Sequence, residues 1–183
     1  MRTLIWHRND LRIQDNEPIY KAVQDGDEIL PVYIFPLERN ERFPFEIAEV
    51  STFRKAFLRE SIQSLMENWS MLGTELLVVK GNPAEIIADL CKKYSIDNVY
   101  TSKEYAAYEI REEERVEAAL KDLNCRLSCF HTSTLIHPSQ LPFTIQSLPD
   151  IFTLFRKEVE THCTFAKPFS TIKQVKPLTH EGS

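Results

Sequence analysis

Glycine is scarce in this chain: four glycines, at positions 26, 73, 81 and 182, occur among 183 residues. Loops that cradle phosphate groups need closely spaced glycines, because a side chain would keep the backbone away from the phosphate. No two of the four are close enough for a Gly-x-Gly-x-x-Gly or Walker loop, and no His-Glu-x-x-His or Gly-x-Ser-x-Gly motif occurs. We therefore expect no dinucleotide or nucleoside-triphosphate site of those kinds, and no active site of the types that these two catalytic motifs mark.

Cysteine pairs of the zinc-binding kind are missing as well. The four cysteines are Cys91, Cys125, Cys129 and Cys163, and none forms a Cys-x-x-Cys pair. Of the five histidines, those at positions 7, 131, 137 and 162 do not have ligand spacing either. We predict no metal site. Cys125 and Cys129 fit one face of a strand, where free cysteine packs as a small apolar side chain in a reducing compartment.

The chain also lacks an excess of basic residues and a long apolar run. Lysine and arginine number 22 against 27 acidic residues, so the net charge is −5. A free-standing nucleic-acid-binding protein usually has a basic surface, and this balance argues against one. No run reaches the length of a membrane span, and Arg8, Asp10 and Arg12 interrupt the apolar start too early for a signal peptide. We predict no membrane contact and a cytoplasmic location, or an organellar one after removal of a transit peptide.

Apolar strands alternate with helical patterns along most of the chain. The predicted strands cover residues 3–7, 28–35, 74–80, 97–101 and 125–130, and the predicted helices begin near 16, 51, 82 and 105. Such alternation predicts an α/β fold, a parallel sheet with helices on both faces. We expect a three-layer α/β/α domain over residues 1–132, with a five-stranded Rossmann-like sheet in the order 3-2-1-4-5.

Several local features refine this expectation. Pro31 lacks a backbone donor and should therefore lie at the beginning or edge of its strand. The helix over about 51–72 carries apolar residues at three- and four-residue spacing, among them Phe53, Phe57 and Leu65, which predicts a buried face. Three interpretations are open for Phe43 and Phe45 in the loop before this helix: they cover a ligand, pack on a neighbouring domain or lie on their own sheet.

The pattern changes after residue 131. Residues 133–183 are predicted to form an extended segment, a short helix over about 150–162 and the start of an interdomain linker, with a polar, proline-bearing end.

Polar residues follow the first and fourth predicted strands, whose carboxyl ends meet where the strand order reverses. Two interpretations of the first cluster, around Asp10 and Asn16, are open. In one, its groups pair with one another and cap the first helix; in the other, Arg8, Asn9 and Asp10 rim a ligand cleft. The second cluster is Thr101-Ser102-Lys103-Glu104-Tyr105.

Glu104 also allows two interpretations. With Thr101 it matches a capping box for the next helix. Alternatively, its carboxylate faces the cleft and accepts paired hydrogen bonds from a pterin-like heterocycle. Tyr105 and Tyr108 are then either core residues or flank such a ring. The run 112–114, three glutamates, is predicted to be a solvated helix face.

The opening residues, Trp6-His7-Arg8-Asn9-Asp10-Leu11-Arg12 with Asp15-Asn16, resemble the start of the photolyase/cryptochrome family. The stretches 53–65, 76–83, 101–116 and 133–149 resemble the family too, and the last two are most similar to its DASH-type cryptochromes. The order and spacing of these motifs together cover the chain to about residue 170. His7 and Asn9 depart from the pattern, which more often has Phe and Arg there.

The resemblance implies an N-terminal domain that holds a light-harvesting antenna chromophore, in DASH-type members methenyltetrahydrofolate. Glu104 stands at the position of their folate-contacting glutamate, and the predicted cofactor-binding residues are Asn9, Asp10, Lys103, Glu104 and Tyr105. The resemblance places FAD, the electron-transfer tryptophans and the DNA-lesion pocket in a larger C-terminal helical domain, so we expect no FAD, no catalytic residue and no direct DNA contact in this chain.

The resemblance also implies a parent protein that repairs pyrimidine dimers in blue light, as deoxyribodipyrimidine photolyase, a carbon–carbon lyase, or that acts as a photoreceptor. The alternative reading is a stand-alone α/β nucleotide-binding or protein-interaction module.

Overall fold

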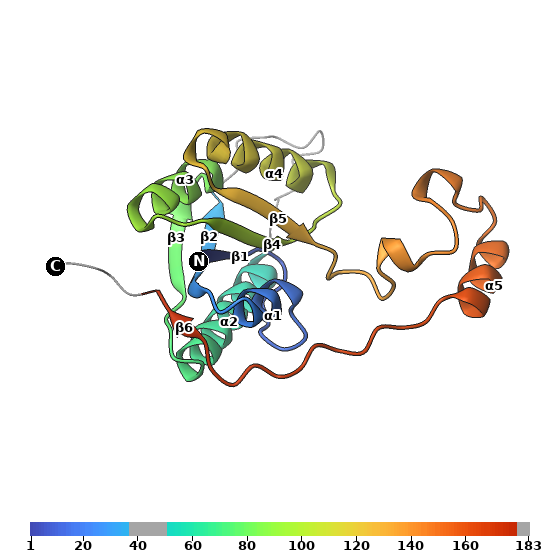
Figure 1. Cartoon of the computed structure of the whole chain (residues 1–183), viewed down its shortest axis with the longest axis horizontal. Coiled ribbons are helices and arrows are strands. Elements are labelled where there is room, and N and C mark those ends of the chain that lie inside the picture. Colours follow the sequence, from blue (N-terminus) through green and yellow to red (C-terminus); the bar gives the residue numbers. More distant parts are fainter. Residues whose placement is uncertain (37–50, 179–183) are drawn as a thin grey trace.

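The computed structural model describes residues 1–36 and 51–178, so the predictions for Phe43 and Phe45 lie outside the described residues. Its parallel sheet has the order β3-β2-β1-β4-β5 (Figure 1). The strands are β1 (Arg2–His7), β2 (Glu28–Pro36), β3 (Leu77–Gly81), β4 (Asn98–Ser102) and β5 (Arg126–Phe130). The predicted fold class and strand order are confirmed.

Helices cover both faces of the sheet (Figure 1). The helices α1 (Glu17–Gln24) and α2 (Thr52–Met71) lie on one face, and α3 (Pro83–Tyr94) and α4 (Ala107–Leu120) lie on the other. A fifth helix, α5 (Phe152–His162), and the short 3₁₀ turns Pro138–Gln140 and Ile145–Ser147 form an arm away from the sheet. Among the described residues, no helix is long and apolar enough to cross a membrane.

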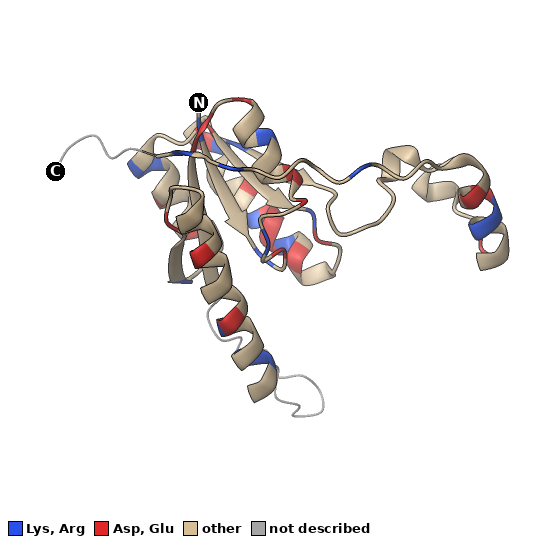
Figure 2. Cartoon of the chain, turned by 90° about the horizontal axis from the view of Figure 1, so that it is seen from below, with Lys and Arg blue, Asp and Glu red and all other residues tan. Residues whose placement is uncertain are grey.

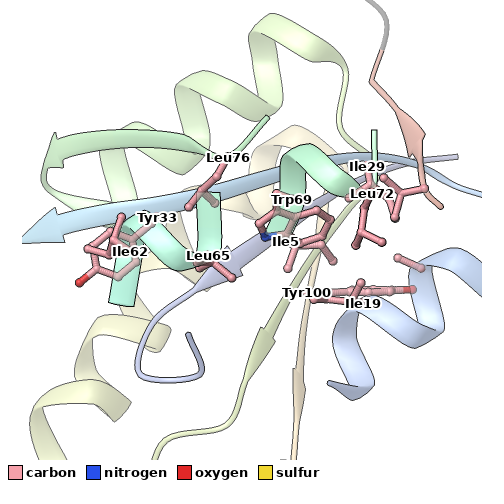
Figure 3. Close-up of a cluster of buried hydrophobic side chains, with 12 residues drawn as sticks. Ile5, Ile19, Ile29, Tyr33, Ile62, Leu65, Trp69, Leu72, Leu76 and Tyr100 are labelled. Atoms are coloured by element: carbon pink, nitrogen blue, oxygen red, sulfur yellow. The ribbon is translucent and has the colours of Figure 1, made fainter. Parts of the chain in front are cut away.

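Successive residues of β1 supply two separate cores, because side chains alternate across a strand. Ile5 packs with Ile19, Leu65, Trp69 and Tyr100 on the α1/α2 face (Figure 3). Leu4 and Trp6 point to the opposite face, where the core also contains the buried side chains Val32, Ile87, Val99, Val116 and Leu120. Burial on both faces is typical of a central strand in a parallel sheet. It fixes the position of β1 and therefore of the polar residues that follow it.

Pro31 lies inside β2, opposite Ile5 of β1, and not at the beginning or edge of a strand. Its missing donor is nevertheless tolerated. Glu28 N donates to Met1 O, while Ile29 O accepts from Leu178 N on the other side, so odd-numbered residues of β2 direct their backbone groups away from β1. On that side, the pairing with β3 begins only at Val32. Pro31 therefore lies on the side of β2 between its pairing with residues 176–177 and its pairing with β3, where no backbone donor is required.

The predicted helix starts at Asn16 and Asn82 are confirmed. The Asn16 side chain accepts from Ile19 N at 3.3 Å, and the Asn82 side chain accepts from Ala84 N at 3.1 Å, with proline in the first turn of each helix. These side-chain acceptors satisfy amide groups that have no partner inside the helix.

The predicted buried face of α2 is wrong for its first half. Phe53 and Phe57 are 87% and 70% exposed, and only Ile62, Leu65 and Trp69 of the helix are buried. The N-terminal half of α2 projects beyond the sheet (Figure 2), so its apolar spacing has no core to meet.

The polar C-terminal segment returns to the sheet, which its composition did not indicate. Residues Lys176–Pro177 form β6, a short strand parallel to β2, and Val175 is buried against the α1/α2 core. On the way back, Phe169 N donates to Asp15 Oδ1 at 3.0 Å. The segment after the arm is thus fastened to the domain at two points.

Val175→Ala is expected to lower the free energy of unfolding by about 1.5–2 kcal/mol, because two buried methyl groups are lost. Urea denaturation followed by circular dichroism measures the change. Lys173→Ala, an exposed neighbour, is the control and should change stability by less than about 0.5 kcal/mol. Equal stability of the two variants would show that the returning segment is not part of the cooperative fold.

Candidate functional site

The loops after β1 and β4 meet at the carboxyl edge of the sheet, as predicted. Asn9 Nδ2 donates to Glu104 Oε1 at 3.0 Å, and Ser102 Oγ donates to Asp10 Oδ2 at 2.7 Å. The two strands are neighbours in the sheet, and the chain order reverses between them. This is the position at which open α/β sheets bind ligands.

Asp10 organises the loop that connects β1 to α1. Its carboxylate accepts from Arg8 N at 3.0 Å and from Asn16 Nδ2 at 3.1 Å, in addition to Ser102. Asn16 in turn caps α1. The interpretation that this cluster pairs with itself and caps the first helix is therefore confirmed, and the oxygens of Asp10 are already occupied by protein donors.

Glu113 is buried, which contradicts the prediction of a solvated face for residues 112–114. The residue is only 4% exposed. Its Oε1 accepts from Arg8 Nη1 at 2.7 Å and from Glu104 N at 3.1 Å, and its Oε2 contacts Lys103 Nζ. Glu112 lies 3.2 Å from Arg8 Nη2. Two cations and two carboxylates thus form an ion network beneath the surface, because α4 packs directly over the ends of β1 and β4.

Glu104 is half-buried at the rim of this network. It does not cap a helix, since α4 begins only at Ala107 and has no side-chain cap. Thr101, the other half of the predicted box, donates its hydroxyl to Trp6 O at 2.9 Å. Burial raises the pKa of the Glu104 carboxyl; Asn9 and Arg8 lower the pKa, and the nearby carboxylates of Asp10 and Glu109 raise it.

Glu109 is a candidate that the sequence reasoning missed. Its carbonyl oxygen accepts from Arg8 Nη2 at 3.1 Å. Its carboxyl Oε2 is buried and has no hydrogen-bond partner among residues 1–36 and 51–178. A buried acceptor without a donor is costly, so it marks a place where a ligand donor would be favourable. The signal in the sequence was its position in the first turn of the helix that follows Glu104.

Tyr105 and Tyr108 are not core residues. Tyr105 is 48% exposed, and its hydroxyl lies 2.6 Å from Nδ1 of His131, whose ring stacks on it. Burial lowers the pKa of His131, as do the nearby His137 and Lys103. Tyr108 donates to Glu112 at 3.1 Å. Tyr105 is thus a partly exposed aromatic residue that follows Glu104 directly in the sequence.

A shallow hollow of about 170 Å³ lies next to this edge; it contains none of the five predicted cofactor-binding residues, but Tyr108, the other candidate for flanking the ligand ring, lines it. It is lined by Gly81, Asn82, Pro83, Ala84, Tyr108, Glu112 and Arg115. No group of three or more His, Cys, Asp or Glu side chains in the described part of the chain has the arrangement of a metal site.

Comparison with known proteins identifies the family. The family model for DNA photolyase matches residues 3–175, nearly the whole chain. This chain belongs to the DNA photolyase family. The resemblance inferred from the opening motif is therefore confirmed.

The photolyase-family domain is similar to the N-terminal part of cryptochromes of the DASH type. It is 35% identical over 175 residues to cryptochrome DASH of Gloeobacter violaceus, covering 96% of this chain and 35% of that protein. It is 36% identical to the chloroplastic/mitochondrial cryptochrome DASH of Arabidopsis thaliana, covering 88% of this chain and 29% of that one. The chain spans about a third of the length of these relatives.

A solved structure shows the same arrangement. The structure of a Synechocystis cryptochrome superimposes with a TM-score of 0.92 at 33% identity, covering 96% of this chain and 37% of that one. That coverage leaves almost no part of this photolyase-family domain unmatched.

The two departures from the family motif have structural consequences here. The imidazole of His7 is buried and accepts a hydrogen bond from Trp69 Nε1 at 3.0 Å. Asn9, where the family motif more often has arginine, contacts Glu104 as a neutral donor. In this photolyase-family domain, the contact between residue 9 and Glu104 is therefore a hydrogen bond from a neutral amide and not an ion pair.

Proposed function

We propose that this domain binds a reduced folate, methenyltetrahydrofolate, as an antenna chromophore at the edge formed by Asn9, Asp10, Lys103, Glu104 and Tyr105. The observation that carries the proposal is the half-buried carboxylate of Glu104, whose two oxygens lie at the edge where the loops after β1 and β4 meet. These acceptors match the paired N–H donors that a pterin ring presents along one edge.

Each predicted residue has a distinct part in this proposal. Glu104 accepts hydrogen bonds from the amino and ring N–H groups, while Asn9 holds one of its oxygens in place. Tyr105 offers its exposed ring as a flank for the heterocycle. Asp10 and Lys103 act indirectly, because their polar atoms already bind protein groups and shape the two loops.

Glu104→Gln is expected to weaken folate binding about 10- to 100-fold, because hydrogen bonds to a charged acceptor contribute about 1.5–3 kcal/mol. Absorbance titration of the purified domain with methenyltetrahydrofolate measures the affinity. Glu114→Gln removes an exposed carboxylate of the same helix region and should bind like the wild type. Equal affinity of the Glu104 variant and the wild type would remove Glu104 from the site.

The proposal for the whole protein is a photolyase or a DASH-type blue-light receptor, in which a C-terminal helical domain carries FAD and any contact with DNA. The relatives extend over about three times the length of this chain. The arm also exposes apolar side chains that a further domain would cover, and they are Ile145, Leu148, Ile151, Phe152 and Leu154. The purified domain is then expected to hold no FAD, and stoichiometric FAD would contradict the assignment.

We further propose residues 133–183 as an extended segment, a short helix and the start of the linker to that helical domain. A cytoplasmic or organellar location is part of the same proposal. It is supported by the chloroplastic/mitochondrial relative.

A further inference from the structure

We propose that Glu113 is a positioning residue for the ligand site: it fixes the backbone at Lys103 and Glu104 and so presents the Glu104 carboxylate at the sheet edge. The inference rests on the proposed function for the identity of the ligand. Glu113 itself lies beneath the surface, so its effect on a ligand passes through Glu104.

The geometry of Glu113 joins three separate parts of the chain. From α4, its two oxygens reach Arg8 at the end of β1, the Lys103 ammonium, and the backbone N–H of Glu104. The bond to a backbone N–H matters most for position, because it fixes the peptide that carries the Glu104 side chain. Asn9 then fixes the other end of Glu104, so that both backbone and carboxylate are held.

Glu113 also controls the charge around Glu104. Arg8 and Lys103 both carry positive charge beside Glu113, and Arg8 lowers the pKa of the Glu104 carboxyl. Burial raises the pKa of the Cys129 thiol to about 11, and the nearby carboxylate of Glu113 contributes to the rise. A neutral side chain at position 113 would leave more of the positive field acting on Glu104, and the pKa of Glu104 would fall.

The first test uses the domain without folate. In Glu113→Gln, we expect the NMR signal of the Glu104 amide to move and the pKa of the Glu104 carboxyl to fall below its wild-type value. Glu114→Gln changes the neighbouring exposed glutamate and should alter neither quantity. A purely structural role for Glu113 would lower stability without moving the titration of Glu104.

The second test adds methenyltetrahydrofolate. Glu113→Gln is expected to weaken binding about tenfold at pH 7, corresponding to the loss of one hydrogen bond in the site. Binding should be lost as pH falls through the pKa of Glu104, so the midpoint of that loss should move to lower pH in the variant.

Glu113→Asp covers the case in which Glu113→Gln does not fold. It keeps the charge but shortens the reach to Glu104 N, so the amide signal should move and folate binding should weaken. An unchanged Glu104 amide and pKa in Glu113→Gln, or an unchanged amide and affinity in Glu113→Asp, would overturn the inference. Failure of the wild type to bind folate, with Glu104 still responding to Glu113→Gln, would refute only the proposed ligand.

Discussion

Replacing Arg8 by methionine is expected to lower the free energy of unfolding by about 3 kcal/mol, near the lower end of the range for breaking a buried ion pair. The Arg8 side chain is 5% exposed and that of Glu113 is 6% exposed, with 2.7 Å between Nη1 and Oε1. The loss stays near the lower end because Lys103 still neutralises part of the Glu113 charge. Arg8 also lies over the ring of Trp6, 4.7 Å from its centroid, and that contact is lost with it.

Arg12→Met is the matched control for this measurement. The Arg12 side chain is 52% exposed, and its nearest carboxylate oxygen, on Asp15, is 3.9 Å away. Exposed pairs of this kind contribute little, so its stability should change by less than about 1 kcal/mol. Chemical denaturation of both variants at pH 7 decides the matter: similar small losses in the two would show that the Arg8 network is solvated in solution.

Most of the fold could be predicted because its signals are local. Each strand is a short apolar run, and proline after asparagine marks the start of α1 and α3 by a mechanism that acts within one turn. Once strands and helices alternate, the handedness of the crossovers leaves few strand orders.

The wrong predictions arose where tertiary packing decides. Phe53 and Phe57 have core spacing, but the N-terminal half of α2 projects beyond the sheet (Figure 2), and the buried residues of the helix begin at Ile62. Pro31 lies inside a strand because a neighbouring strand starts one residue later. Neither fact can be read from the residues around the position in question.

The residues that meet at the candidate site were predicted from the sequence, but the buried glutamate that contacts them was not. Asn9, Asp10 and Glu104 come together because parallel strands end at one edge. Glu113 was overlooked because a run of three glutamates is typical of a solvated face. A signal was nevertheless present: Glu113 lies three and seven residues before the buried Val116 and Leu120, on the same stripe of α4.

Removing the Trp69 side chain is the second change expected to have a large effect. Trp69→Ala should lower the free energy of unfolding by about 3–5 kcal/mol at pH 7.5, because the indole is fully buried at the centre of the α1/α2 core. The indole also fixes the state of His7. Its N–H donates to His7 Nε2, so the imidazole proton resides on Nδ1 and faces Asp10 O at 3.2 Å. Met66→Ala, at an exposed position on α2, is the control.

The stability of the wild type is expected to decrease as the pH is lowered, because His7 is buried in the folded domain. Burial lowers the pKa of His7 and outweighs the nearby Asp10 carboxylate, which raises it. Below about pH 6.5, His7 therefore takes up a proton in the unfolded chain but not yet in the folded domain. Stability should be complete above that pH and decline below it, by up to about 1.4 kcal/mol per pH unit until the folded pKa is reached. His7→Phe cannot take up this proton, so its denaturation midpoints between pH 7.5 and 5 should decline less steeply than those of the wild type; parallel declines would assign the acid sensitivity to other groups.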